Sequence, residues 1–155
     1  MEVGRAYFET NTRRFTILDA PGHKTYVPSM ISGAAQADVA ILVISARKGE
    51  FETGFEKGGQ TREHIMLVKT VGVSRVVIVV NKMDDPTVEW SQERYNEVKE
   101  KLTPFVKSAG FNPKMDVNYI PISAYTAVNV KDPAGSVAPW VTCVRRFLRS
   151  HLILT

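Results

Sequence analysis

Residues 76–84 read Val-Val-Ile-Val-Val-Asn-Lys-Met-Asp, so that five consecutive apolar residues run directly into a polar tetrapeptide. Uninterrupted Val and Ile, with no polar alternation, predict a strand buried on both faces of a parallel sheet. A second run of this kind is VAILVI at 39–44, and a shorter strand is predicted at 117–122. The NKMD tetrapeptide therefore lies at the end of a strand, where open α/β sheets bind their ligands.

Hairpin and helical patterns surround these strands. Segments 3–10 and 13–18 alternate in the manner of a hairpin joined at Asn11-Thr12. Apolar spacing predicts helices over three ranges, namely 26–36, 61–71 and 91–109. The predicted helix boundaries are Thr61 and Ser91 as N-caps and Gly72 and Gly110 as C-terminal stops, and Pro104 is expected to kink the last helix. Strands alternating with helices favour an α/β fold with a mostly parallel sheet.

The composition is that of an ordinary globular domain, with 44% hydrophobic and 23% charged residues in 155 positions. Charged residues break up the first twenty positions, and no apolar run is long enough for a membrane span, so no membrane association is expected. Cys143 is the single cysteine, which suits a reducing cytoplasm. Of the net charge of +4, +3 falls in residues 133–155, so a solvated basic tail is favoured and direct DNA binding is not expected.

The segment Asp19-Ala20-Pro21-Gly22-His23 (DAPGH) follows the strand predicted at 13–18. A carboxylate at a strand end can hold Mg²⁺ beside the phosphates of a nucleotide, usually through water. Gly22 allows the backbone to approach a terminal phosphate, and His23 has the chemistry to orient an attacking water. Taken alone, this segment is better explained as a simple Pro-Gly turn.

The NKMD segment, Asn81-Lys82-Met83-Asp84, is more specific. The two oxygens of the Asp84 carboxylate match the N1 hydrogen and the 2-amino group of guanine, whereas adenine presents the opposite polarity. Asn81 can brace the loop, and the apolar stem of Lys82 can pack along the base. The competing interpretation is a surface loop in which Asp84 is a turn former.

A third polar segment, Ser123-Ala124-Tyr125 (SAY), follows the strand predicted at 117–122. It can offer a backbone N–H to the guanine carbonyl and brace the Asp84 loop. Most triplets of this kind are ordinary loops. The order of DAPGH, NKMD and SAY, each after a strand, is what favours a guanine-nucleotide site at one sheet edge.

These motifs resemble those of the translational GTPases related to elongation factor Tu. The stretch GEFETGFEKGGQTREH (Gly49–His64) is similar to the eukaryotic elongation and release factors. GRAYFET (Gly4–Thr10) and NKMDDPTVEW (Asn81–Trp90) look most like the GTPase domain of the class II polypeptide release factor. The resemblance runs from Glu2 to about Val130.

The resemblance implies a cytoplasmic enzyme of translation termination, which binds GTP or GDP with Mg²⁺ and cleaves GTP together with the class I release factor and the ribosome. Asp19 would be the carboxylate on the magnesium side, Gly22 the γ-phosphate sensor and His23 the catalytic histidine. The base would be read by residues of the second and third motifs, namely Asn81, Lys82, Asp84, Ser123 and Ala124.

The sequence departs from this family at both ends. The phosphate-loop string GxxxxGK[ST] occurs nowhere, and the pattern is lost from about Trp140. The expected fold is therefore a P-loop-type GTPase fold lacking the first strand, phosphate loop and first helix, with a partial GTP-binding domain at 1–139 and a divergent tail at 140–155. The missing strand would lie between strands 13–18 and 39–44, so these two strands should present unpaired edges. GTP hydrolysis by this chain is expected to be impaired.

Three alternatives remain open from the sequence. One is a non-enzymatic remnant that binds no nucleotide, and another is the related elongation or ribosome-rescue GTPase. The third is a dinucleotide-binding dehydrogenase, which would need a GxGxxG turn after its first strand; the sequence contains none.

Overall fold

The computed structural model describes residues 4–10, 13–19, 31, 36–55, 59–130 and 132–141. Its centre is a parallel sheet of three strands in the order β3-β4-β5. The strands are β3 (Val39–Ser45), β4 (Arg75–Asn81) and β5 (Val117–Pro121). All three predicted parallel strands are thus confirmed, and the chain belongs to the α/β class.

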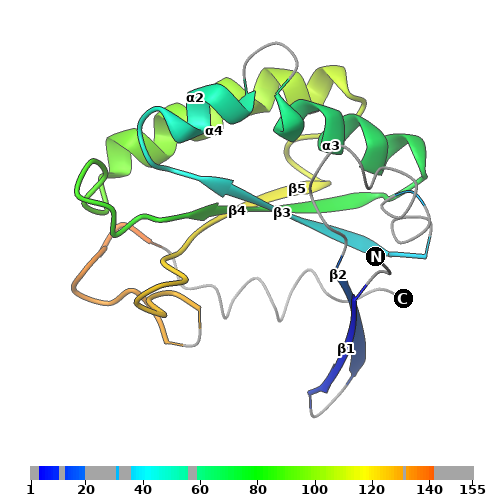
Figure 1. Cartoon of the computed structure of the whole chain (residues 1–155), viewed down its shortest axis with the longest axis horizontal. Coiled ribbons are helices and arrows are strands. Elements are labelled where there is room, and N and C mark those ends of the chain that lie inside the picture. The colour runs from blue at the N-terminus through cyan, green and yellow to red at the C-terminus, as the bar shows by residue number, and fades with distance from the viewer. Residues whose placement is uncertain are drawn as a thin grey trace.

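Three helices lie together on one face of this sheet (Figure 1): α2 (Glu50–Phe55), α3 (Gln60–Thr70) and α4 (Gln92–Ser108). The α4 residues Val98, Leu102 and Val106 repeat every four positions, so they form one stripe along the helix. This stripe is buried in one cluster with Ile78 and Val80 of β4. Within the described ranges, no helix is both long and apolar enough to cross a bilayer.

The expectation that strands 39–44 and 76–80 are buried on both faces is wrong for β3, and in β4 only the face of Val76, Ile78 and Val80 is fully buried. On the helix face Ile44 is buried, but Ile41 and Val43 on the other face are 68% and 58% exposed. The physical reason is that the described helices all cover the same face of the sheet (Figure 1). A continuous apolar run therefore marks this strand correctly but overstates how much of it is covered.

The N-terminal strands β1 (Gly4–Glu9) and β2 (Arg14–Asp19) form a separate antiparallel ribbon, as the hairpin prediction requires. Their register places Phe8 opposite Phe15, and the two rings stack with centroids 4.7 Å apart. In Figure 1 the ribbon points away from the parallel sheet, and β2 does not pair with β3. This agrees with the expected absence of pairing between strands 13–18 and 39–44.

Helix boundaries follow the local signals at three of four positions. Ser91 caps α4, because its Oγ accepts a hydrogen bond from the Arg94 N–H at 3.2 Å. Gly72 and Gly110 follow α3 and α4 with φ of 95° and 96°, the left-handed region in which glycine is unstrained. The prediction that Thr61 caps α3 is wrong, since the N-cap is Gly59, without a side-chain bond.

The remaining helix observations concern the range 26–36, the short helix α2 and Pro104. Most of the helix predicted at 26–36 lies outside the described residues. The short helix α2 was not predicted, although Phe51 and Phe55 have helical spacing and their rings stack at 5.6 Å. Pro104 lies inside α4, which continues to Ser108, and the expected kink at this residue stays a prediction.

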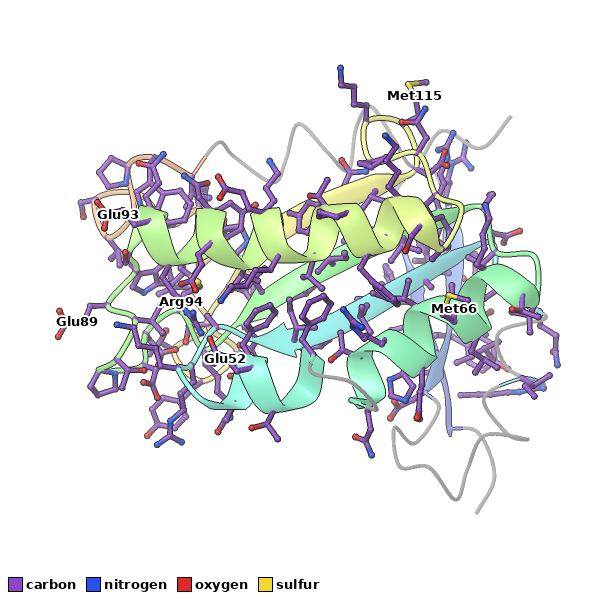
Figure 2. The ribbon with its side chains drawn as sticks, turned by 90° about the horizontal axis from the view of Figure 1, so that it is seen from above. Glu52, Met66, Glu89, Glu93, Arg94 and Met115 are labelled. Atoms are coloured by element: carbon purple, nitrogen blue, oxygen red, sulfur yellow. The ribbon has the colours of Figure 1, made fainter. Side chains whose placement is uncertain are left out.

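Leu102→Ala is expected to lower the free energy of unfolding by about 2–5 kcal/mol, because it leaves a cavity at a site with no solvent exposure. Met115→Ala is the control, since Met115 is 70% exposed and stands out from the molecule (Figure 2). The control should change stability by no more than about 0.5 kcal/mol. Urea denaturation measures both values, and equal losses would contradict the packing of α4 against β4.

Candidate functional site

The side chain of Asn81 joins the loops that follow β4 and β5. Its Oδ1 accepts hydrogen bonds from the Lys82 N–H at 2.7 Å and from the Ala124 N–H at 2.9 Å. A backbone bond from the Met83 N–H to the Ile122 carbonyl, at 3.2 Å, lies beside them. Because β4 and β5 are parallel neighbours, their carboxyl ends meet and bring the NKMD and SAY segments together.

The loop at 82–90 is held in a fixed and partly strained form. Lys82, Glu89 and Trp90 have φ of 61°, 48° and 52°, values that residues other than glycine rarely adopt. The Trp90 N–H donates to the Met83 carbonyl at 2.7 Å, and the Met83 side chain is fully buried. Met83 therefore anchors the loop in the core, and such strain persists only where the surroundings impose it.

The carboxylate of Asp84 is not engaged by any residue in the described part of the chain, whereas the side chains of Lys82 and Asp85 make hydrogen bonds. The Lys82 ammonium donates to Glu50 Oε2 at 2.7 Å. Asp85 Oδ1 accepts from the Thr87 hydroxyl at 2.6 Å and from the Thr87 N–H at 2.9 Å. This arrangement leaves Asp84 available to a ligand at the end of β4.

Charged side chains from the segment after β3 reach this loop. Arg47 lies 3.2 Å from Glu50 and 3.4 Å from Asp85, so it links the two carboxylates. Hydrogen bonds from Lys82 and Ser45 hold the pKa of the Glu50 carboxyl below its usual value. Hydrogen bonds from the Thr87 hydroxyl and N–H likewise lower the pKa of Asp85. Both carboxylates are therefore charged at neutral pH.

The SAY segment is anchored through Ser123, which has no solvent exposure. Its N–H donates to the Val128 carbonyl at 3.1 Å, and its Oγ accepts from the Thr126 N–H at 3.1 Å. The N–H groups of Ser123 and Ala124 are both engaged, the latter by Asn81. The Tyr125 N–H is the remaining donor of this triplet, and it has no bond to a described residue. The Tyr125 side chain is 94% exposed.

The first motif is described only at Asp19, which ends β2 and is exposed. Ala20, Pro21, Gly22 and His23 lie outside the described residues. No recorded contact joins Asp19 to the NKMD or SAY segments, and β2 lies in a different sheet. Two of the three polar segments thus share one sheet edge, whereas Asp19, the described residue of the third, ends a strand of another sheet.

A magnesium ion is compatible with a single carboxylate such as Asp19. Mg²⁺ keeps several waters and is bound through one or two carboxylates together with substrate phosphates. Among the described residues, no three side chains of His, Cys, Asp or Glu gather into a metal-binding group. The donors therefore suit a partly hydrated Mg²⁺ and not a metal enclosed entirely by protein ligands.

Sequence reasoning missed Arg47, Glu50 and Thr87 at this site, and also Asn129. Asn129 is buried, and its amide donates to the Pro121 carbonyl at 2.7 Å, which supports the end of β5. Glu50 and Thr87 lie in the stretches that carry the family resemblance, but neither stretch assigns them a role, and the contacts of Arg47 with Asp85 and of Glu50 with Lys82 arise only through the fold. Local sequence carries no signal that would have found them.

A parallel sheet with two joined polar loops at the carboxyl ends of its strands is typical of nucleotide-binding α/β domains. Comparison with known proteins identifies the family: the model of the elongation factor Tu GTP-binding domain matches residues 1–151. The chain belongs to this family of translational GTPase domains.

Similar proteins include release factor subunits. The chain is 62% identical over 142 residues to the eukaryotic peptide chain release factor GTP-binding subunit of Schizosaccharomyces pombe, covering 90% of this chain and 22% of the relative. It thus spans about a fifth of the relative's length. The crystal structure of Sup35 complexed with GMPPNP matches with a TM-score of 0.78 and 53% identity, covering 94% of this chain and 34% of that chain. Sup35 complexed with GDP gives a TM-score of 0.77 and 51% identity, with the same coverages.

Proposed function

We propose that this chain binds the guanine base of GTP and GDP as part of the GTPase domain of a translation termination factor. The observation that carries the proposal is the Asn81 side chain, which ties the NKMD loop to the SAY loop through the Ala124 N–H at 2.9 Å. The Asp84 carboxylate, in the first of these loops, is not engaged by the described residues. Such an arrangement is suited to a planar ligand that presents two adjacent donors.

The recognition chemistry follows from the groups that remain available. The Asp84 carboxylate accepts from N1–H and from the 2-amino group of guanine, and a charged acceptor strengthens both bonds. The Tyr125 N–H is the donor for the guanine carbonyl, because the Ala124 N–H is already engaged by Asn81. The Lys82 stem packs along the face of the base while its ammonium stays on Glu50. Adenine offers the wrong polarity to both groups.

The phosphate side of the site rests on the family resemblance and on Asp19. Asp19 would hold Mg²⁺, which supplies neutralisation of the phosphate charge when it is bound. Gly22 and His23 are proposed to sense the terminal phosphate and to orient the water. Relatives named as release factor GTP-binding subunits support a class I release factor and the ribosome as partners, in the cytoplasm.

The proposal is tested by titrating the ¹⁵N-labelled 155-residue chain with GDP and ADP in the presence of Mg²⁺. GDP should shift the amide signals of residues 82–85 and 123–126, and ADP should leave them in place. Affinity should be weaker than micromolar, because these residues contain no GxxxxGK[ST] loop and most binding energy comes from phosphate contacts.

Two results would contradict this proposal. Equal shifts with GDP and ADP would exclude guanine recognition by Asp84. Micromolar or tighter binding of GDP would mean that another group holds the phosphates, and the expectation of impaired binding by this chain would fail.

A further inference from the structure

Four charged residues form a cluster beside the NKMD loop: Arg47, Glu50, Lys82 and Asp85. Glu50 accepts from Lys82 at 2.7 Å and lies 3.2 Å from Arg47, and Arg47 in turn lies 3.4 Å from Asp85. The cluster therefore joins two segments that are more than thirty residues apart in the sequence. We call it the charge cluster.

A backbone contact reinforces the charge cluster. The Lys48 N–H donates to the Thr87 hydroxyl oxygen at 3.4 Å, and the Thr87 hydroxyl itself donates to Asp85 Oδ1 at 2.6 Å. The start of α2 thus holds the NKMD loop at both Lys82 and the Asp85–Thr87 turn. Asp84 lies between these two points of attachment.

The charge cluster is too exposed to be a folding element. Three of its side chains, those of Arg47, Lys82 and Glu50, are 51%, 48% and 39% exposed, and only that of Asp85, at 15%, is largely covered. Ion pairs as exposed as these contribute little to global stability. The buried ion pairs of α2 and α4 run through Arg94, which is 5% exposed and lies 2.9 Å from Glu52 (Figure 2). What the charge cluster fixes is local, namely the path of residues 82–87.

We propose that Glu50 and Arg47 are positioning residues for guanine recognition: they hold the NKMD loop at Lys82 and Asp85, in addition to the hold that Asn81 provides, so that Asp84 points its carboxylate at the base. This inference rests on the proposed function. Glu50 neutralises the Lys82 ammonium, so Lys82 acts through its aligned stem and not as a phosphate-binding charge. Arg47 transmits the same constraint to Asp85, the neighbour of Asp84.

The first test needs no nucleotide. In Glu50→Gln and Arg47→Ala, amide hydrogen exchange at Asp85, Val88 and Glu89 should rise about threefold, as expected for loss of an exposed charge network. Arg47→Lys keeps the charge and should restore most of the protection. Exchange at buried Val98 and Leu102 of α4 reports global opening and should stay constant.

The matched control is Glu93→Gln. Glu93 is an exposed carboxylate in the first turn of α4, with no ion pair to a described residue, and it points away from the molecule in Figure 2. This variant removes the same charge without touching the charge cluster. Exchange in the NKMD loop should therefore match that of the unsubstituted chain.

The second test measures base recognition by nuclear magnetic resonance titration with GDP and inosine diphosphate. Inosine lacks the 2-amino group, so the ratio of the two dissociation constants reports how well the Asp84 carboxylate is aligned. The preference for GDP should fall about threefold in Glu50→Gln, in line with the loss of an exposed charge network. It should be unchanged in Glu93→Gln.

The outcomes separate this inference from the proposed function. Exchange in Glu50→Gln equal to that in Glu93→Gln would overturn the positioning role, whatever the nucleotide data show. Raised exchange with an unchanged preference for GDP would overturn the link to base recognition. An unsubstituted chain that prefers neither nucleotide would refute the proposed function, and the exchange data would still decide whether the charge cluster positions the loop.

Discussion

Asp84→Asn is expected to shift base preference from GTP toward xanthosine triphosphate by about 10³-fold, taking a loss of about 2 kcal/mol for guanine and a similar gain for xanthine. The substitution replaces one carboxylate oxygen by an amide that donates. Xanthine carries a carbonyl where guanine carries its 2-amino group, so the new donor finds an acceptor. The side chain at position 84 can select the base in this way because the described residues leave the Asp84 carboxylate unengaged.

The measurement is competition between the two triphosphates, in the chain extended at its N-terminus by a phosphate-loop unit of the GxxxxGK[ST] type. Glu93→Gln is the control, since Glu93 is an exposed carboxylate with no ion pair to a described residue. The control should leave the preference for GTP unchanged. An unchanged GTP preference in Asp84→Asn would remove Asp84 from the site.

His23→Ala is expected to lower ribosome-stimulated GTP turnover by about 10²–10⁴-fold while leaving GTP affinity nearly intact, because a group that orients water acts on the transition state. We propose this role from the DAPGH motif, in which His23 follows Gly22, the proposed phosphate sensor. Turnover is measured in the extended chain with ribosomes, and affinity by direct binding. A fall of less than tenfold would make His23 an ordinary loop residue.

The sequence predicts the parts of this molecule that depend on neighbouring residues. The run Val76–Val80 specifies a buried strand, and Ser91 caps the next helix because its hydroxyl reaches the Arg94 N–H within the same turn. The NKMD segment was placed correctly at the end of that strand for the same reason. Local order was enough for each of these.

Contacts between distant segments are predictable only where motifs indicate them. The order of the motifs predicts that the SAY segment braces the NKMD loop, as the bond from the Ala124 N–H to Asn81 does, whereas nothing in the sequence predicts the bond from Lys82 to Glu50, which spans 32 positions. The exposure of Ile41 depends on which sheet face the helices cover, which the composition of a strand does not specify. Thr61 failed as a cap because the helix begins one residue earlier, at Gln60, after a glycine.

The left-handed residues Lys82, Glu89 and Trp90 have a consequence for the kinetics of recognition. Their conformations are imposed by contacts within the protein, with Asn81 on one side and the backbone bonds of residues 83–91 on the other. The entropic cost of ordering this loop is therefore met during folding, and a base that binds here does not have to order it. Association should thus be a single encounter step without a slow closing phase, and weakened variants of this loop should differ in how fast the base leaves.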